Sequence, residues 1–112
     1  MGVPAVDVTL DYAEFRCRHL VDGQRVGARV QINYVPHQHL IPPDKLRTYL
    51  EGIEDDKGSP EWFAAVIAAD LMRVAQPHRL TVKVTFARQC GVLAEVTVPL
   101  MSPQMALRQQ QR

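Results

Sequence analysis

The chain has little of what marks several common classes of protein. Only two of its 112 residues are cysteines, Cys17 and Cys90, which excludes a framework held by several disulfides. No apolar run approaches the roughly 20 residues that a membrane-spanning helix needs. Thirteen Lys and Arg residues against twelve Asp and Glu leave a net charge of +1, too little for a dominant basic surface. We therefore expect neither a membrane nor a nucleic acid as partner.

The overall composition is that of an ordinary globular protein. Apolar residues make up 46% of the chain and charged residues 22%, while aromatic residues are sparse at 6%. A chain of 112 residues can bury one hydrophobic core without the help of disulfides or a structural metal, so we expect one domain at residues 1–101 and a C-terminal tail at 102–112. The start of the chain has no basic segment followed by an apolar one, which predicts a cytoplasmic protein.

Two helices are predicted in the middle of the chain. Ser59 can cap a helix and Pro60 suits its first position, so a helix should run from there to about Ala75. Its apolar stripe has three- and four-residue spacing and contains Phe63, Val66, Ile67, Leu71 and Val74. A shorter helix should begin near Pro42-Pro43-Asp44 and place on one face Leu46, Tyr49, Leu50 and Ile53.

Alternation of apolar and polar residues predicts four strands, near residues 6–11, 28–34, 80–86 and 92–98. Pro36 and Pro99 should end the second and the fourth strand. The charged segment 54–58 should be a solvated loop. The order strand, strand, helix, helix, strand, strand predicts an α+β domain in which a four-stranded antiparallel sheet carries both helices on one face. Its unpaired outer strands invite pairing with a neighbouring subunit.

The sequence from Glu14 to Val92 can be aligned without a gap to the sequences of a known family. The agreement is strongest at Glu14-Phe15, Gly23-Gln24, Ile32-x-Tyr34-x-Pro36, Leu46-x-x-Tyr49-Leu50, Glu61, Ile67-x-x-Asp70-Leu71, Pro77, Leu80, Phe86 and Gly91. In these residues the chain resembles the 7-cyano-7-deazaguanine reductases of queuosine biosynthesis, short nitrile reductases of the tunnelling fold (T-fold). The resemblance implies a homo-oligomer whose subunits close their sheets into a barrel and bind ligand between neighbours.

The family's catalytic motif is altered in this chain. In the family, a cysteine followed by Pro-x-Thr-Gly-Gln-x-Asp attacks the nitrile, NADPH reduces the resulting thioimide, and the aspartate donates a proton. His19 stands at the nucleophile position and Val26 at the aspartate position. A histidine cannot form the same thioimide, so we expect no nitrile reduction. Cys17, two residues away, could replace the nucleophile only if the loop were re-registered.

The resemblance also bears on the ligands. The family's cofactor-contacting Glu-Ser-Lys is replaced by Pro42-Pro43-Asp44, so the motif that binds NADPH is not retained and the cofactor stays unknown. Glu61 matches the residue that receives N–H groups from the guanine-like edge of the substrate, and Pro60 replaces the histidine beside it. The resemblance therefore implies that Glu61 binds a deazaguanine, guanine or pterin-like ring. The helix alone favours the simpler explanation that Glu61 is a first-turn acid that complements the helix dipole.

Other functions stay open at this stage. His19 could act as acid or base in an enzyme with altered chemistry, because imidazoles exchange protons near neutral pH. A zinc site could be built from His19, His37, His39, Cys17 and Cys90, although their spacing is not diagnostic and ordinary surface histidines explain it as well. The chain could also be a non-catalytic structural subunit. His78 has no predicted partner.

Overall fold

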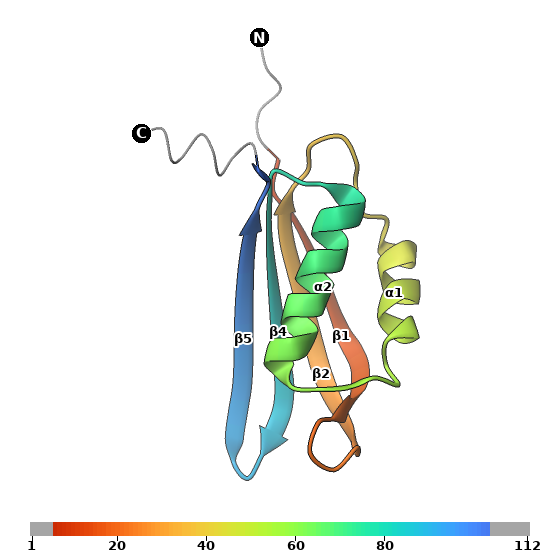
Figure 1. Ribbon diagram of the computed structural model, residues 1–112, viewed down its shortest axis with the longest axis vertical. Helices are drawn as coiled ribbons and strands as arrows, with labels where there is room; N and C mark the ends of the chain where they lie inside the picture. Colours follow the sequence, from red (N-terminus) through yellow and green to blue (C-terminus); the bar gives the residue numbers. More distant parts are fainter. Residues whose placement is uncertain (1–5, 104–112) are drawn as a thin grey trace.

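The computed structural model describes residues 6–103, and the expected tail lies outside them from residue 104 onward. Five strands and two helices follow one another along the chain (Figure 1). They are β1 (Val8–His19), β2 (Arg25–Val35), α1 (Pro43–Gly52), β3 (Lys57–Gly58), α2 (Pro60–Ala75), β4 (Arg79–Gln89) and β5 (Val92–Met101). The predicted mixed α+β class and the order of the six long elements are confirmed. No helix within residues 6–103 is long and apolar enough to cross a membrane.

The sheet has five strands rather than the predicted four, in the order β3-β1-β2-β4-β5. The four long strands are antiparallel, whereas β3 runs parallel to the end of β1 and pairs Lys57 with Arg18 and Gly58 with His19. The expectation that residues 54–58 form only a solvated loop was therefore wrong. A two-residue strand is too short to leave a periodic signal in a sequence.

Charged contacts hold this loop against the edge of the sheet. The Arg16 amide donates to Glu54 Oε2 at 2.9 Å, and the Arg25 guanidinium donates to the Glu54 carbonyl at 2.7 Å. Arg25 also donates to Asp55 Oδ1. The acids of the loop are part of the surface, as expected, but they also occupy hydrogen-bonding groups that a sheet edge would otherwise present to solvent.

All four long strands are longer than their sequence patterns predict, and β1 and β5 continue past a feature that interrupts the pattern. β1 continues past Asp11, where the predicted strand ended. The pattern stops there because a bulge between Tyr12 and Phe15 breaks the alternation and leaves Ala13 and Glu14 both exposed. β5 continues through Pro99, which was expected to end it. β5 is the last strand of the sheet, and an edge strand tolerates a residue without an N–H group.

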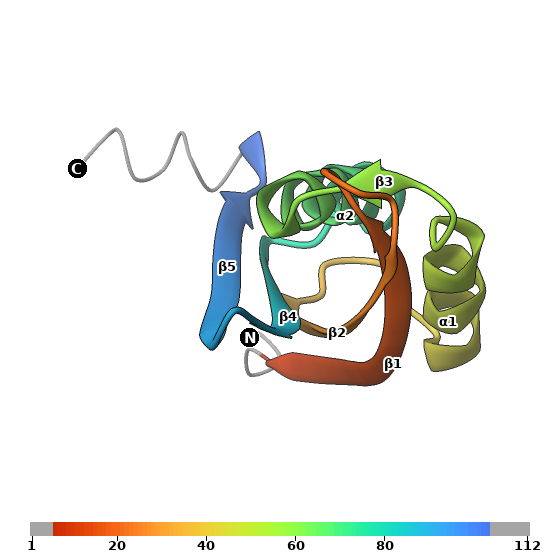
Figure 2. The same ribbon diagram turned by 90° about the horizontal axis from the view of Figure 1, so that it is seen from below.

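The sheet is curled, and α2 lies across its concave face against β4 and β5 (Figures 1 and 2). The buried face of α2 combines two kinds of side chain, the large Phe63, Ile67 and Leu71 and the small Ala64, Ala68 and Ala75. The small residues allow a close approach to the strands. The face of α2 that is buried therefore differs from the predicted apolar stripe, because it includes these alanines. Val74, predicted to be on that stripe, is 66% exposed.

The position of α1 also differs from the prediction. Figure 2 shows α1 beside β1 at the margin of the sheet, whereas only α2 crosses the concave face. Leu46 and Leu50 of α1 nevertheless reach the common core. The loop before α1 is fixed by Tyr34, whose buried hydroxyl accepts a hydrogen bond of 2.9 Å from the Ile41 amide. This bond links β2 to the start of α1.

We expect Tyr34→Phe to lower the free energy of unfolding by about 1–3 kcal/mol, because it leaves the buried Ile41 amide without its acceptor. Urea denaturation of wild type and variant measures the difference. Tyr12→Phe is the matched control, since the side chain of Tyr12 is only partly buried. Equal stability of the Tyr34 variant and wild type would show that solvent replaces the hydroxyl.

Candidate functional site

Three segments meet at the end of the molecule where β1 terminates. His19 is the last residue of β1 and pairs with Gly58 of β3. Ser59 follows Gly58 and caps α2, whose second residue is Glu61. Glu61 thus stands three residues after the pairing partner of His19, and the start of α2 and the end of β1 lie at the same end of the sheet (Figure 1). The fold brings the two candidate site residues to one region.

The backbone and the ring of His19 are both fixed by its own hairpin. The His19 amide donates to the Gln24 carbonyl at 2.8 Å, and the His19 carbonyl accepts from the Gly23 amide at 2.9 Å. Ring atom Nδ1 accepts a hydrogen bond of 3.2 Å from the Val21 amide. The neutral ring therefore carries its proton on Nε2, where it can act as a donor to a ligand. The side chain is 24% exposed.

Glu61 lies in the exposed first turn of α2. The Ser59 hydroxyl accepts from the Trp62 amide at 3.1 Å, which confirms the predicted cap. Among residues 6–103, no hydrogen-bond or ion-pair partner contacts the Glu61 carboxylate. The helix dipole favours a negative charge at this position, so the carboxylate is suited to accept hydrogen bonds from donors outside the chain.

Gly58 makes the turn into α2 possible, although no sequence pattern predicted a role for it. A Cβ at this position would lie 2.5 Å from a ring carbon of Trp62 and 2.9 Å from a ring carbon of Phe63. The two aromatic rings contact each other edge to face, with centroids 4.9 Å apart. Trp62 remains 41% exposed and adds an aromatic surface next to Glu61. The sequence signal that could have pointed to this aromatic surface was a tryptophan directly after the candidate carboxylate.

Cys17 is not placed to act as the missing nucleophile. It pairs with Val26 across the β1–β2 ladder, and its side chain is completely buried in the core. Burial raises the pKa of the Cys17 thiol to about 11, because desolvation disfavours the thiolate. The family's acid position is also occupied by a side chain, Val26, that packs against the core and cannot exchange a proton.

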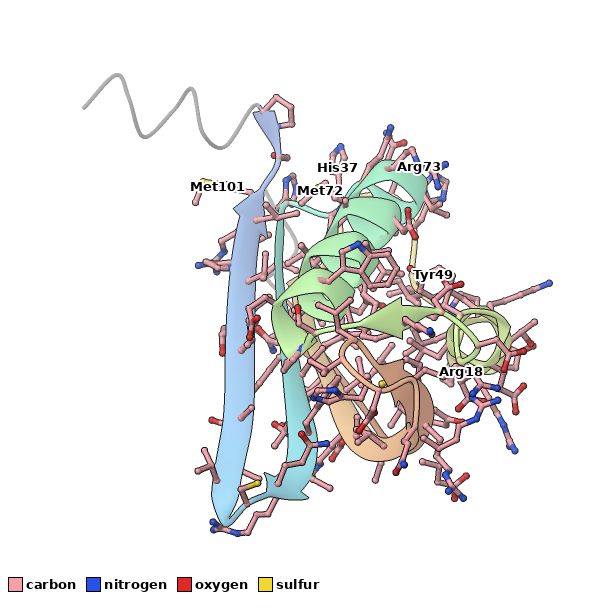
Figure 3. All side chains as sticks on the ribbon, turned by 60° about the horizontal axis from the view of Figure 1, so that its bottom comes forward. Arg18, His37, Tyr49, Met72, Arg73 and Met101 are labelled. Atoms are coloured by element: carbon pink, nitrogen blue, oxygen red, sulfur yellow. The ribbon has the colours of Figure 1, made fainter. Side chains whose placement is uncertain are left out.

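The structure does not bring the proposed zinc ligands together. Cys17 is in the core, Cys90 is exposed in the turn between β4 and β5, and His37 lies at the end of the molecule opposite Arg18, the neighbour of His19 (Figure 3). Within the described residues, no three His, Cys, Asp or Glu side chains gather in a metal-binding cluster. The structure instead gives His78 a partner, the ring of His37.

A groove of about 450 Å³ lies between α1 and the second half of α2, away from Glu61. Its lining is mainly apolar and includes Leu40, Leu71 and Val74. At its polar side the Tyr49 hydroxyl donates to Asp70 at 2.5 Å. Burial, reinforced by this hydrogen bond, raises the pKa of Tyr49, so the phenol stays protonated and links the two helices. This groove therefore lies at a different place from the candidate site.

Comparisons with known proteins place the chain in a family. The sequence model of the family described as QueF-like protein matches residues 27–104, beginning directly after the altered motif. The chain is 30% identical over 91 residues to the NADPH-dependent 7-cyano-7-deazaguanine reductase of Thermomicrobium roseum, covering 81% of the chain and 71% of that enzyme. It is 28% identical over 80 residues to the corresponding reductase of Gloeobacter violaceus, covering 71% of the chain but only 58% of that enzyme.

A solved structure agrees with this result at the level of the fold. The apo crystal structure of the archaeosine synthase QueF-Like superposes with a TM-score of 0.74 and covers 88% of this chain and 95% of that protein. The sequence identity is 13%, so this comparison supports the fold alone. The matched family model and the reductase from Thermomicrobium roseum confirm the resemblance found in the sequence. This chain belongs to the QueF-like protein family.

Proposed function

We propose that this chain is a degenerate or repurposed nitrile-reductase-like protein that binds a deazaguanine, guanine or pterin-like ring through Glu61. The observation that carries the proposal is the Glu61 carboxylate, exposed at the start of α2 and without a partner among residues 6–103. Two parallel N–H groups on the edge of such a ring match the two oxygens of one carboxylate. The exposed face of Trp62 offers the flat ring an apolar contact beside that edge.

Loss of the reductase reaction is part of the same proposal. The nucleophile position holds an imidazole whose Nδ1 already accepts from the Val21 amide, and the acid position holds Val26. The nearest thiol, Cys17, is inaccessible in the core. Because attack on a nitrile needs an exposed thiolate, no described cysteine near the hairpin can start the reaction. The relatives are named as NADPH-dependent, but under this proposal the chain has no nitrile reduction for NADPH to drive.

We further propose that the binding site is completed by a second copy of the chain. The reductases' T-fold closes several sheets into a barrel, and the outer edge of β5 supports such pairing, because within the described residues only β4 pairs with it. β5 has ten residues, and a strand of this length presents a long open edge to solvent.

A second candidate function rests on the tautomer of His19. With Nδ1 accepting from the Val21 amide, the neutral ring carries an N–H group on Nε2 that can donate a hydrogen bond to a bound ring and polarise it. In this case the chain is an enzyme with altered chemistry at the same site. Turnover of a bound purine or pterin, abolished by His19→Gln, would favour it over simple binding.

We expect no reduction of 7-cyano-7-deazaguanine when the protein is incubated with this nitrile and NADPH. The physical reason is the replacement of the nucleophile by His19 and of the acid by Val26. Absorbance of NADPH measures its oxidation, and mass spectrometry detects both the amine product and any covalent adduct. The reductase of Thermomicrobium roseum is the positive control. Coupled NADPH oxidation and amine formation, or an adduct on Cys17, would contradict the proposal.

We expect Glu61→Gln to weaken binding of the ring by about tenfold to a hundredfold, because an amide donor then faces a ligand donor and a charge-assisted bond worth roughly 1.5–3 kcal/mol is lost. Calorimetric titration with guanine, 7-cyano-7-deazaguanine and a pterin measures the change. Asp44→Asn is the matched control, since Asp44 is the first-turn acid of the other helix. If wild type binds a ring and Glu61→Gln binds it equally, Glu61 only stabilises the start of α2.

We expect the protein to exceed the 12.6 kDa of one chain in solution at micromolar concentration. Sedimentation velocity measures the mass, and Leu93→Lys tests the edge, because a lysine on an outer strand disfavours pairing with another chain. Leu40→Lys is the control, as it replaces another exposed leucine outside the sheet. A wild-type protein that sediments as a monomer would remove both the edge pairing and the shared site.

A further inference from the structure

The structure holds two histidines together at the end of the sheet opposite the candidate site. His37 follows β2 and His78 precedes β4, and the centroids of their rings are 4.4 Å apart with the planes tilted by 49°. Figure 3 shows His37 at the end of the molecule where Arg73 marks the last turn of α2. The two residues are 41 positions apart in the sequence, so only the fold brings them into contact.

The backbone around the pair is fixed at several points. β2 and β4 end their ladder with Val35 opposite Arg79, and the His78 amide donates to the Val35 carbonyl at 2.9 Å. The His78 carbonyl in turn accepts from the Ser102 amide at 3.0 Å, which ties it to the end of β5. Proline precedes each histidine, and its restricted φ reduces the freedom of both segments. The proximity of the two rings therefore follows from backbone contacts.

The ring nitrogens have no competing partner in the described part of the chain. No protein group between residues 6 and 103 donates a hydrogen bond to, or forms an ion pair with, the side chain of His37 or His78. His37 is exposed and His78 half-buried, so solvent and solutes reach the pair. A centroid separation of 4.4 Å allows both imidazoles to bind one ion after small side-chain rotations, because each ring would lie about 2.0–2.1 Å from the ion through one nitrogen.

We propose that His37 and His78 form a two-imidazole site for a divalent late transition metal, with water in the remaining positions. Within the described residues no third His, Cys, Asp or Glu joins the pair, which disfavours the closed four-ligand site that structural zinc requires. Copper(II) and nickel(II) accept nitrogen and oxygen donors in tetragonal geometry and bind imidazole more strongly than the earlier divalent metals. Such an ion would clamp the end of β2 to the start of β4.

The site is independent of the proposed ring-binding function. His19 and Glu61 lie at the other end of the sheet, so a failure of one proposal leaves the other standing. His39 provides a built-in control, because it belongs to the same loop as His37 but lines the groove between the helices and has no ring contact with His78. Nickel(II) is the better probe, since copper(II) can oxidise the exposed thiol of Cys90.

The test is a calorimetric titration of the untagged, metal-free protein with nickel chloride. We expect one saturable site per chain, weakened by about tenfold or more in both His37→Ala and His78→Gln, because one imidazole alone loses the gain from holding the ion twice. His39→Ala and His19→Ala should bind as wild type does. Melting with and without nickel gives a second readout, since an ion that binds only the folded chain raises the melting temperature.

Two outcomes of the nickel titration would contradict the proposed site. Wild type without a saturable nickel site, or His37→Ala with unchanged affinity, shows that the rings only stack. An equal loss of affinity in His39→Ala shows that the assignment of the pair is wrong. The metal-free variants are melted first, and since His37 is exposed its replacement should leave the melting temperature of the metal-free protein unchanged.

Discussion

The contact of Trp62 and Phe63 with Gly58 is the constraint on which the candidate site depends. No Cβ fits between these rings and the backbone of β3, so the chain can pass from the sheet into α2 only with glycine at this position. Phe63 then packs edge to face against Phe15 of β1, with ring centroids 5.5 Å apart. The same packing that closes the core therefore fixes where α2 begins and where Glu61 is presented to solvent.

The chemistry of this end of the molecule follows from which groups are buried and which are not. Cys17 has the reactive atom that the family's reaction needs, but the curl of the sheet encloses it and raises the pKa of its thiol. His19 and Glu61 are accessible but provide an imidazole and a carboxylate, groups suited to hydrogen bonding and proton transfer rather than to thioimide formation.

Several contacts join residues that no local pattern connects. The Tyr34 hydroxyl holds the Ile41 amide, the Tyr49 hydroxyl holds Asp70 across the two helices, and the rings of His37 and His78 meet beyond the ends of their strands. The histidine contact depends on the register between β2 and β4, and the contact of Tyr49 with Asp70 depends on how α1 and α2 approach each other. These contacts fix the loops at the end of the sheet opposite the candidate site.

The sequence by itself determined the α+β class, the order of the long elements, the cap of α2 at Ser59 and the family, because periodicity, capping and the ungapped agreement are local or collinear signals. Only the tertiary structure decided the second half of β1, the strand β3, the exposure of Val74 and the separation of the five proposed metal ligands. A bulge hides alternation, a two-residue strand has no period, and the distance between side chains remote in sequence depends on how the sheet curls, which no local pattern records.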